Sequence, residues 1–439
     1  MNWIKNFNAI ATSEKRKTAL SIVSAGLDAI DTESVIRTNI FLSESILKIK
    51  DQSFELAHFD AIRIIGFGKV VCKAVATLES ILGDRIKSGI VIGTEAAIGS
   101  PAITSFVGSH PLPSDINVKA SAEIVNLAQS LSERDLVIVI VSGGGSSLLC
   151  WPPEECDQGR RLYEDFLKTG ATIEELNTVR KHISLLKGGG LAKMLYPATV
   201  IGLIFSDVPG HGDTFYATVA SGPTYPDNLT VADAENVLKK YGLGGYTLRE
   251  TPKDKTYFKK VFNIPLVSNY DALQAMAKYG QQHGFTTTIL SDAMYDPPEE
   301  VVTAMFTAAT AAGNTDTDKM QLILAGGEPK IEVPIEHGTG GRNEHTTLEA
   351  IRFLSAKKDA TIANDAVFIS LASDGHDNNT AAGAIADTET LAKASAAGLS
   401  AEKYLAAFDA YSFFEKTGDL IVTGQTETNV SDLMVLLTG

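Results

Sequence analysis

Short apolar runs that end in glycine or a charged residue recur along the chain. One of them begins at Asp135 and continues Leu-Val-Ile-Val-Ile-Val to Val141. A nearly unbroken β-branched run is typical of a strand that is covered on both faces of a parallel sheet. The sequence therefore predicts a buried strand here. Comparable runs, also predicted as strands, occupy residues 61–69, 88–93, 200–206, 321–325, 366–372 and 420–423.

Apolar residues at helical spacing alternate with these runs. Ile22, Val23 and Gly26 return with Leu27 and Ile30 on one face, which predicts an amphipathic helix within the first 40 residues. Another helix is predicted at about 343–356, after a glycine-rich approach. Strand, loop and helix in alternation predict an α/β fold with doubly wound sheets.

The length of the chain favours two domains. A chain of 439 residues exceeds the size at which one hydrophobic core keeps growing. A polar, glycine-bearing stretch lies between Leu238 and Val261, and the strand pattern restarts beyond it. We predict an N-terminal domain of residues 1–250 and a C-terminal domain of residues 251–439.

Charge and cysteine content exclude several classes of partner. The formal net charge of −15 argues against nucleic acid, although local basic groups can still bind an anionic small molecule. Cys72, Cys150 and Cys156 have spacings unlike a zinc site or a disulfide framework. We find no signal-peptide pattern and no apolar stretch near the roughly 20 residues of a membrane span. We therefore expect a cytoplasmic protein with reduced thiols and no membrane partner.

The loop after the 135–141 run has almost no side chains. Three consecutive glycines remove the Cβ atoms that would keep an anion away from backbone N–H groups, and serines add hydroxyl donors. Such a loop at the carboxyl edge of a parallel sheet is where α/β proteins usually bind ligands. A plain strand-to-helix turn is the alternative, and the spacing fits neither a Walker loop nor a nucleophile elbow. The predicted substrate- or phosphate-binding residues are Ser142, Gly143, Gly144, Gly145, Ser146 and Ser147.

Two other glycine loops carry a basic residue at a predicted helix start. Lys69 closes the 61–69 run, where it could neutralise phosphate oxygens beside helix amides, unless it is a solvated surface lysine. Gly340 and Gly341 precede Arg342 and Asn343, so that a guanidinium fork and free amides could meet one phosphate.

Acidic residues follow several of the runs. Asp207 lies at a predicted strand end, and Asp374 and Asp377 lie three residues apart in a glycine turn. Together with Glu328 they are candidate ligands of a Mg²⁺ ion that arrives with a nucleotide. Simple aspartate caps of turns or helices would give the same pattern.

A basic cluster stands out in this acidic chain. Arg180, Lys181 and Lys187 lie on and after a predicted helix that ends at glycine. Positive charge stabilises the carboxyl end of any helix, which is the structural interpretation. The functional interpretation is a pocket for an anion, with Arg180 and Lys187 as its binding residues.

Taken together, the motifs resemble the ATP-dependent glycerate 2-kinases, whose C-terminal part is called the MOFRL domain. The resemblance spans nearly the whole chain and implies two Rossmann-like α/β/α domains with an active-site cleft between them. It also implies transfer of the ATP γ-phosphoryl group to the 2-hydroxyl of D-glycerate with Mg²⁺, and catalytic roles for Lys69 and Arg342. A homodimer is left open. The segments that carry the resemblance are 66–69, 109–115, 141–149, 176–192, 206–210, 220–227, 326–328, 338–345, 373–375, 381–387 and 426–433.

Some positions depart from the family pattern. His211-Gly212-Asp213 stands where Asp-Asp is expected after SDVPG, and the turn at 377–380 and the segment 424–429 also differ. These changes leave the acceptor open, so a kinase for a related small hydroxy acid is one alternative.

Two alternatives lie outside the kinases. One is an NAD(P)-dependent hydroxypyruvate or tartronate reductase, which Val71 disfavours because it replaces the third glycine of a dinucleotide fingerprint. The other is a relative that binds a sugar acid without turnover.

Overall fold

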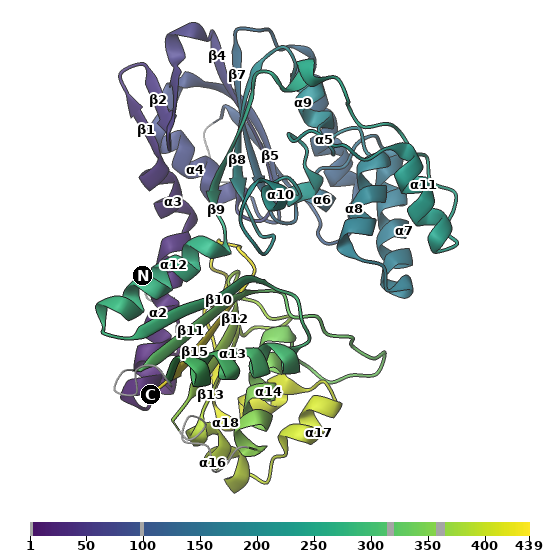
Figure 1. Ribbon diagram of the computed structural model, residues 1–439. Coiled ribbons are helices and arrows are strands. Elements are labelled where there is room, and N and C mark those ends of the chain that lie inside the picture. Colours follow the sequence, from purple (N-terminus) through teal and green to yellow (C-terminus); the bar gives the residue numbers. More distant parts are fainter. Residues whose placement is uncertain (1–2, 97–100, 314–319, 357–364) are drawn as a thin grey trace. The chain divides into compact units, whose positions relative to one another are not determined.

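The computed structural model describes residues 3–96, 101–313, 320–356 and 365–439 (Figure 1). The chain forms two compact units that are not simply consecutive in sequence. The N-terminal unit comprises Thr32–Val208 and Gly212–Leu266. The C-terminal unit comprises Met1–Asp31, Pro209–His211 and Val267–Gly439. Within the described ranges, no helix is long and apolar enough to cross a membrane.

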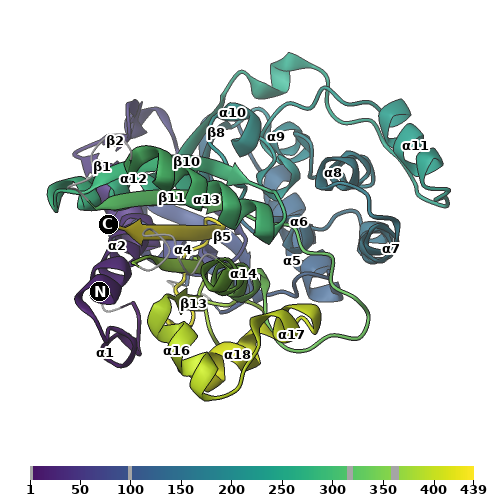
Figure 2. The same cartoon turned by 60° about the horizontal axis from the view of Figure 1, so that its bottom comes forward.

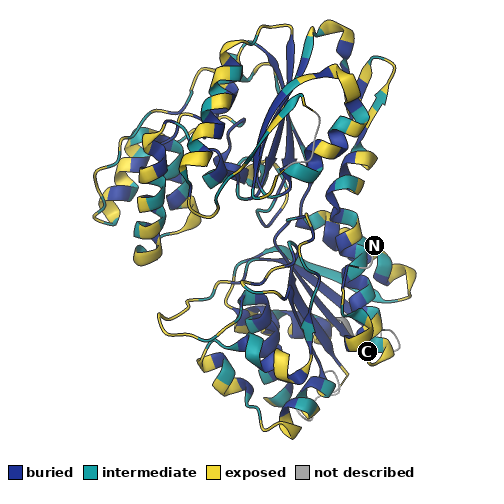
Figure 3. Cartoon of the chain, turned by 180° about the vertical axis from the view of Figure 1, so that it is seen from behind, coloured by how far each residue is buried: buried dark blue, intermediate teal, exposed yellow. Residues whose placement is uncertain are grey.

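A six-stranded sheet forms the centre of the N-terminal unit, in the order β6-β5-β4-β7-β8-β9. The neighbours from β6 to β8 run parallel, and every residue of β7 and β8 is buried (Figure 3). Burial on both faces explains why these strands have continuous apolar sequences. The strands are β4 (Ala61–Phe67), β5 (Ile86–Gly93), β6 (Ile103–Val107), β7 (Asp135–Ser142), β8 (Thr199–Phe205) and β9 (Val261–Val267).

Helices cover both faces of this sheet. Ile65 packs into one core with Ile124 of α5 and Leu191 of α9. On the opposite face, a side chain on Gly66 would overlap Val71 of α4, so glycine allows this helix to lie close to the strand. The helices of the unit are α3 (Thr32–Asn39), α4 (Val71–Leu82), α5 (Asp115–Gln129), α6 (Gly145–Leu148), α7 (Glu154–Thr169), α8 (Ile173–His182), α9 (Gly190–Leu195), α10 (Asp213–Tyr216) and α11 (Val231–Lys240).

Two features of the N-terminal unit are not predicted from the sequence, a small antiparallel sheet and a separate core formed by three helices. An antiparallel sheet of β1 (Ile40–Ser43), β2 (Ile46–Ile49) and β3 (Gln52–Glu55) follows α3. Helices α7, α8 and α11 share a small core of their own, which includes Phe166 and Val179. The polar stretch that predicts a domain boundary therefore begins inside a packed helix.

The C-terminal unit also has a six-stranded sheet, but a mixed one, in the order β10-β11-β15-β12-β13-β14. Only β10 and β11 are parallel, and β15 runs antiparallel to β11 and β12 on either side of it. The predicted strands 321–325, 366–372 and 420–423 are present as β11, β12 and β14. The bounds are β10 (Thr286–Met294), β11 (Gln321–Gly327), β12 (Val367–Ala372), β13 (Gly383–Ala386), β14 (Leu420–Ile421) and β15 (Asp432–Thr438).

This second sheet is likewise a middle layer (Figures 1 and 2). Ile323 of β11 belongs to the core that contains α13 and α14. The preceding residue, Leu322, faces α12 instead, because a side chain on Gly280 of that helix would overlap it. Alternate residues of one strand thus face opposite helix layers. The helices are α1 (Phe7–Ile10), α2 (Glu14–Ile30), α12 (Asn269–Gln282), α13 (Pro298–Gly313), α14 (Arg342–Ala356), α16 (Thr388–Ala396), α17 (Ala401–Ala406) and α18 (Ala410–Thr417).

A buried arginine ties helix α2 to the rest of the C-terminal unit. Arg16 of α2 is fully buried and donates to both carboxylate oxygens of Asp387 at 2.7 Å each. The same guanidinium donates to Asp419 at 2.7 Å and to Thr390 at 2.8 Å. A charge in the interior is tolerated because two carboxylates compensate it.

The α/β class with two Rossmann-like domains is confirmed, since each unit is a sheet between helix layers. The predicted ranges 1–250 and 251–439 stay a prediction, but the compact units divide the chain differently. Residues up to Asp31 pack with the C-terminal unit, because α2 lies against α12 and β15, and the later division falls at Leu266. The predicted interdomain cleft stays a prediction.

We expect Arg16→Met to destabilise the C-terminal unit by about 3–5 kcal/mol, because it leaves Asp387 buried without its partner. The chain has two tryptophans, and Trp3 lies in this unit. Urea unfolding followed by Trp3 fluorescence in a Trp151→Phe background measures the effect.

The neighbouring Lys17→Met is the matched control. Its ammonium is exposed and lies 3.7 Å from Glu14, so the change should be under about 0.5 kcal/mol. Equal effects of the two substitutions would contradict a stabilising role for the buried arginine.

Candidate functional site

Three predicted loops follow neighbouring strands of the N-terminal unit. Lys69 lies after β4, the glycine loop from Ser142 to Ser147 begins at the end of β7, and Asp207 lies after β8. β4 and β7 pair in parallel, as do β7 and β8, so all three loops leave from the same edge of the sheet. The sequence therefore brings these candidates to one edge.

The first two loops are linked by their backbones. The N–H of Lys69 donates to the carbonyl of Gly143 at 2.9 Å, and the N–H of Val70 donates to Ser142 Oγ at 3.4 Å. Gly68 has φ +125°, and a side chain there would overlap Ser142. Only glycine permits both the dihedral angle and the close approach.

The side chain of Lys69 passes beside the glycine loop. A Cβ atom on Gly144 would lie 3.4 Å from Lys69 Cγ and 3.1 Å from the ring of His110. Gly144 also has φ +81°, in the left-handed region that favours glycine. The loop thus presents backbone next to a partly buried lysine, which suits an anionic ligand.

The serines of the loop have different roles. Ser147 Oγ donates to the carbonyl of Gly144 at 3.1 Å, and Ser142 Oγ donates to the carbonyl of Phe67 at 3.4 Å. These two hydroxyls stabilise the turn itself. Ser146 Oγ instead lies 2.9 Å from Ser221 Oγ, outside the loop. Of the predicted serines, Ser146 is the one whose hydroxyl leads away from the turn.

The three residues of the basic cluster have different partners. Lys181 and Lys187 each pair with a carboxylate, whereas among the described residues Arg180 does not. Lys187 is buried, pairs with Glu155 and donates to the carbonyl of Leu149 at 2.7 Å. Lys181 pairs with Asp227 at 3.0 Å. Reaching a ligand would break this buried ion pair, which speaks against the predicted role of Lys187 in substrate binding. That role stays a prediction.

Arg180 of α8 is different. Its Nη1 donates to Asn177 Oδ1 at 2.9 Å, and within the described residues it forms no ion pair. Burial lowers the pKa of Arg180 to about 10, although Glu155 and Tyr163 act in the opposite direction. The guanidinium stays charged at neutral pH and is only partly solvated, so an incoming anion would meet a strong partner.

Asn177 and Ser221 are functional candidates that the sequence does not predict. Ser221 Oγ donates to Asn177 Oδ1 at 3.2 Å, so the two residues connect Arg180 to Ser146. Both lie inside motifs that carry the family resemblance. Uncharged residues in a helix and a turn give no chemical reason to select them, and only the fold shows the contact.

The remaining candidates lie in the C-terminal unit. Arg342, the first residue of α14, pairs with Glu328 at 3.0 Å and with Asp432 of β15. Burial alone would lower the pKa of Arg342, but Asp432 and Glu328 outweigh it and raise the pKa. The exposed fractions of the two partner side chains are 38% for Glu328 and 1% for Asp432.

Asp377 caps the helix that carries this arginine. Its Oδ1 accepts from the backbone N–H of Asn343 at 3.1 Å and its Oδ2 from that of Glu344 at 2.8 Å. A side chain on Gly341 would overlap Asp377. The carboxylate is buried and engaged by helix amides, which speaks against its predicted role as a metal ligand.

Asn343 is engaged in the same way. Its Nδ2 donates to Asp377 at 3.1 Å and its Oδ1 accepts from Ser370 at 2.6 Å. Gly340, at φ +150°, and Gly341, whose N–H donates to Glu344 at 3.1 Å, shape the approach to Arg342. Their predicted contact with phosphate stays a prediction.

Two other predicted metal ligands of the C-terminal unit, Glu328 and Asp374, have partners of their own within the protein. Glu328 is the partner of Arg342, and Asp374 Oδ1 accepts from the N–H of His376 at 3.2 Å. Across the part of the chain that the structure describes, no three acidic, histidine or cysteine side chains gather as a metal site. The residues do not fit a resident metal cage, but a Mg²⁺ that arrives with a nucleotide needs only one or two carboxylates.

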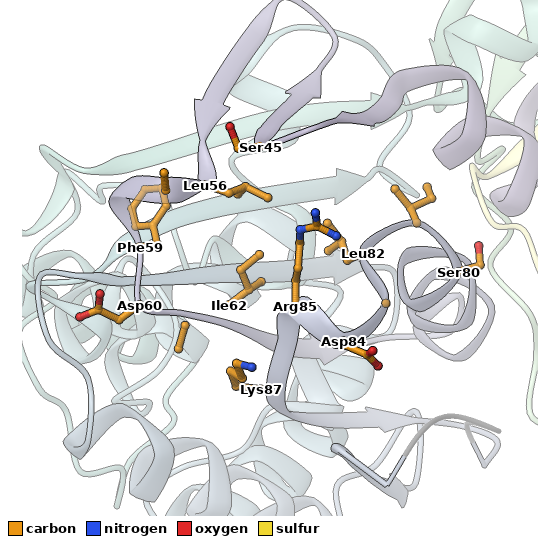
Figure 4. Close-up of a pocket in the computed structure, with 14 residues that line it drawn as sticks. Ser45, Leu56, Phe59, Asp60, Ile62, Ser80, Leu82, Asp84, Arg85 and Lys87 are labelled. Carbon is orange, nitrogen blue, oxygen red and sulfur yellow. The ribbon is translucent and has the colours of Figure 1, made fainter.

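A pocket of about 540 Å³ lies elsewhere in the N-terminal unit (Figure 4). Its lining includes Asp60 and Ile62 at the start of β4 and Arg85 and Lys87 near the start of β5. These are the amino ends of the strands, whereas the glycine loops lie at the carboxyl ends. The pocket is therefore separate from the candidate site.

Comparisons with known proteins agree with the motif-based resemblance. Residues 18–251 match the model "Domain of unknown function (DUF4147)" and residues 321–432 match the MOFRL family. A D-glycerate 2-kinase of Thermotoga maritima is 30% identical, over 96% of this chain and 97% of that protein. A putative hydroxypyruvate reductase of Agrobacterium vitis is 34% identical, over 86% and 87%.

A solved structure gives the same result. The crystal structure of a glycerate kinase from Thermotoga maritima superposes with a TM-score of 0.79 at 29% identity, covering 96% of this chain and 99% of that one. The fold and loops are thus those of a two-domain α/β protein with DUF4147 and MOFRL parts. The chain belongs to the glycerate kinase family with a C-terminal MOFRL domain.

We expect Gly144→Ala to lower glycerate kinase activity at least about tenfold, because the left-handed turn beside Lys69 would shift. It should also destabilise the protein by about 1–2 kcal/mol through the strained dihedral angle. Activity and thermal unfolding measure the two effects.

Gly242→Ala is the matched control. Gly242 has φ +65°, and a Cβ atom at this position would meet nothing within 4 Å, so alanine should bring the strain without the loss of activity. If the two variants lost activity equally, the special role of the glycine loop would be refuted.

Proposed function

We propose that this chain transfers the γ-phosphoryl group of ATP to the 2-hydroxyl of D-glycerate. The relatives named above as glycerate kinases, similar over nearly their full length, support the reaction class. In the reaction, the acceptor oxygen forms a bond to the γ-phosphorus, the bond from that phosphorus to the β–γ bridging oxygen breaks, and ADP, 2-phosphoglycerate and a proton leave.

One observation carries the proposal for the site. Arg180 is a charged guanidinium held, among the described residues, by an amide instead of a carboxylate, in a unit whose sheet carries Lys69 and the glycine loop at its carboxyl edge. Phosphoryl transfer needs mainly positioning and charge stabilisation. We assign the acceptor carboxylate to Arg180, and a transferring phosphoryl oxygen to Lys69.

Arg342 must release one of its two carboxylate partners in order to bind phosphate. We assign Asp432 as its permanent anchor, because that carboxylate is buried, and Glu328 as the exchangeable partner, because it is more than a third exposed. A phosphate oxygen would then take the place of the Glu328 carboxylate. Exchange of one anion for another keeps two anions beside the guanidinium.

We propose Mg²⁺ as a companion of ATP rather than a resident ion. Asp207 in the N-terminal unit and Asp374 in the C-terminal unit are the two remaining candidate ligands, each to be tested separately. When bound, the ion would neutralise phosphate charge.

The decisive experiment is a substrate panel with purified protein. ATP is supplied with D-glycerate, L-glycerate and related three- and four-carbon hydroxy acids, and ³¹P NMR distinguishes 2- from 3-phosphoglycerate. We expect 2-phospho-D-glycerate. Absence of turnover on every acid would reject the kinase proposal.

The name of the Agrobacterium vitis relative favours a second candidate, reduction of hydroxypyruvate. Oxidation of NADH or NADPH in the presence of hydroxypyruvate tests it directly. Val71 packs where the third glycine of a dinucleotide loop would lie, so we expect no oxidation.

We expect Lys69→Ala and Arg342→Ala each to lower kcat by about 10²–10³, the usual effect of removing one charge-stabilising donor. Steady-state kinetics with ATP and D-glycerate measure the change, and circular dichroism checks the fold.

Lys87→Ala and Arg352→Ala are the matched controls. Lys87 lies at the amino end of β5, and Arg352 lies on the same helix as Arg342 but pairs with Glu349 and Glu299. Both should keep kcat within about twofold, as expected for surface changes. A kinase that tolerated loss of Lys69 and Arg342 would disprove their catalytic assignment.

A further inference from the structure

We infer that Asn177 and Ser221 are positioning residues that prepare Arg180 and Ser146 to receive the carboxylate and a hydroxyl of the acceptor acid. The inference rests on the proposed function and deepens it, because it explains how the protein selects a hydroxy acid. All four residues lie in the N-terminal unit. They come from α6, α8 and the short 3₁₀ turn η3 (Val219–Ser221), which contacts both of these helices.

Asn177 orients the arginine without neutralising it. Its Oδ1 accepts from Arg180 Nη1 at 2.9 Å and from Ser221 Oγ at 3.2 Å. Two donors converge on this atom, so it must be the amide oxygen rather than the nitrogen. The well-buried Arg16 is held by carboxylates, whereas Arg180 is held by a neutral amide and keeps its full charge. An amide in this position leaves the ion pair to be completed by a ligand.

The direction of the hydrogen bonds fixes what Ser146 can do. Because Ser221 donates its hydroxyl proton to Asn177, it can only accept from Ser146, which lies 2.9 Å away. The hydroxyl proton of Ser146 is therefore engaged by Ser221, and the lone pairs of Ser146 Oγ can accept a hydrogen bond from a ligand. Within the described residues this hydroxyl has no other hydrogen-bond partner. The network therefore presents a cation at one end and a hydrogen-bond acceptor at the other, which matches a carboxylate and a hydroxyl.

The backbone at Ser221, which positions this hydroxyl, has strained dihedral angles. Ala220, Ser221 and Gly222 have φ values of +51°, +62° and +64°, so two residues other than glycine adopt the left-handed region in succession. Ser221 is fully buried. Residues in this region persist only where the surroundings impose it, and such strain gathers at functional sites.

The surroundings do impose it. The carbonyls of Ser221 and Gly222 accept from the N–H groups of Gly188 and Gly189 at 3.0 and 2.8 Å. Ala220 fits only because Gly145 has no side chain, since a Cβ atom there would lie 2.7 Å from Ala220 Cβ. The turn and the glycine loop are thus shaped to each other, and glycine would be the unstrained choice at position 221. The hydroxyl is the reason to keep serine.

The test separates the hydroxyl from the strain. Ser221→Ala keeps the strain and removes the hydroxyl, whereas Ser221→Gly removes both. We expect both variants to raise the KM for D-glycerate about tenfold while the KM for ATP stays within about twofold, since one ligand-orienting hydrogen bond is lost. We also expect Ser221→Gly to have the higher Tm of the two.

Lys50→Gly is the matched control for strain. Lys50 has φ +51° in the exposed turn between β2 and β3, so glycine should raise the Tm and leave both KM values unchanged. If Ser221→Gly behaved like this control, with no change in the KM for glycerate, the inference would be wrong.

Asn177→Asp tests the charge argument. The new carboxylate would pair with Arg180 from within the protein, so we expect the KM for D-glycerate to rise about tenfold or more, and preference for glycerate over uncharged glyceramide to fall. Asn177→Gln, which keeps an amide, should recover part of the preference. An unaltered preference in Asn177→Asp would overturn the inference, whereas a wild type without turnover on any acid would instead reject the proposed function.

Discussion

The close packing of two glycine turns is the constraint on which the N-terminal unit depends. Because Gly68 has no side chain, the turn after β4 approaches the end of β7, and Lys69 bonds through its backbone to Gly143. That contact fixes Lys69 beside Gly144 and directs Ser146 towards η3. Electrostatic stabilisation requires groups that are already in place when charge develops. Here the sheet register and the missing Cβ atoms of the glycines hold these groups in place.

Much of the fold follows from the sequence, because buried strands have an unmistakable composition. The β-branched run of β7 and the runs of β4, β8, β11 and β12 predict these strands close to their true bounds. The meander at Ile40–Glu55 and the central strand β15 escape prediction. The meander strands are short and contain charged residues, and β15 is rich in Leu and Met rather than in β-branched residues, so its composition does not separate a strand from a helix. The placement of α2 is also not predictable, because an amphipathic pattern shows that a helix buries a face but not which partner covers it.

The candidate site is predictable where a loop follows a strand, and less so where the answer depends on partners distant in sequence. Lys69 and the glycine loop lie together as neighbouring parallel strands require. Lys187 and Asp377 have the right chemistry, but Glu155 and the start of α14 engage them, contacts across 32 and 34 residues that no local pattern reveals. Conversely, Asn177 and Ser221 carry no charge. Only their hydrogen bonds to Arg180 and Ser146 identify them as candidates.

The buried Arg16 also sets an order for folding during synthesis. Its partners Asp387 and Asp419 follow hundreds of residues later, and β15, the central strand of the same sheet, follows them in turn. The N-terminal unit is complete by Leu266, so it can fold while the ribosome is still working. Helix α2 can dock only after these late segments have emerged, and until then Arg16 remains solvated. A fragment that starts at the MOFRL segment would therefore lack one of its own layers.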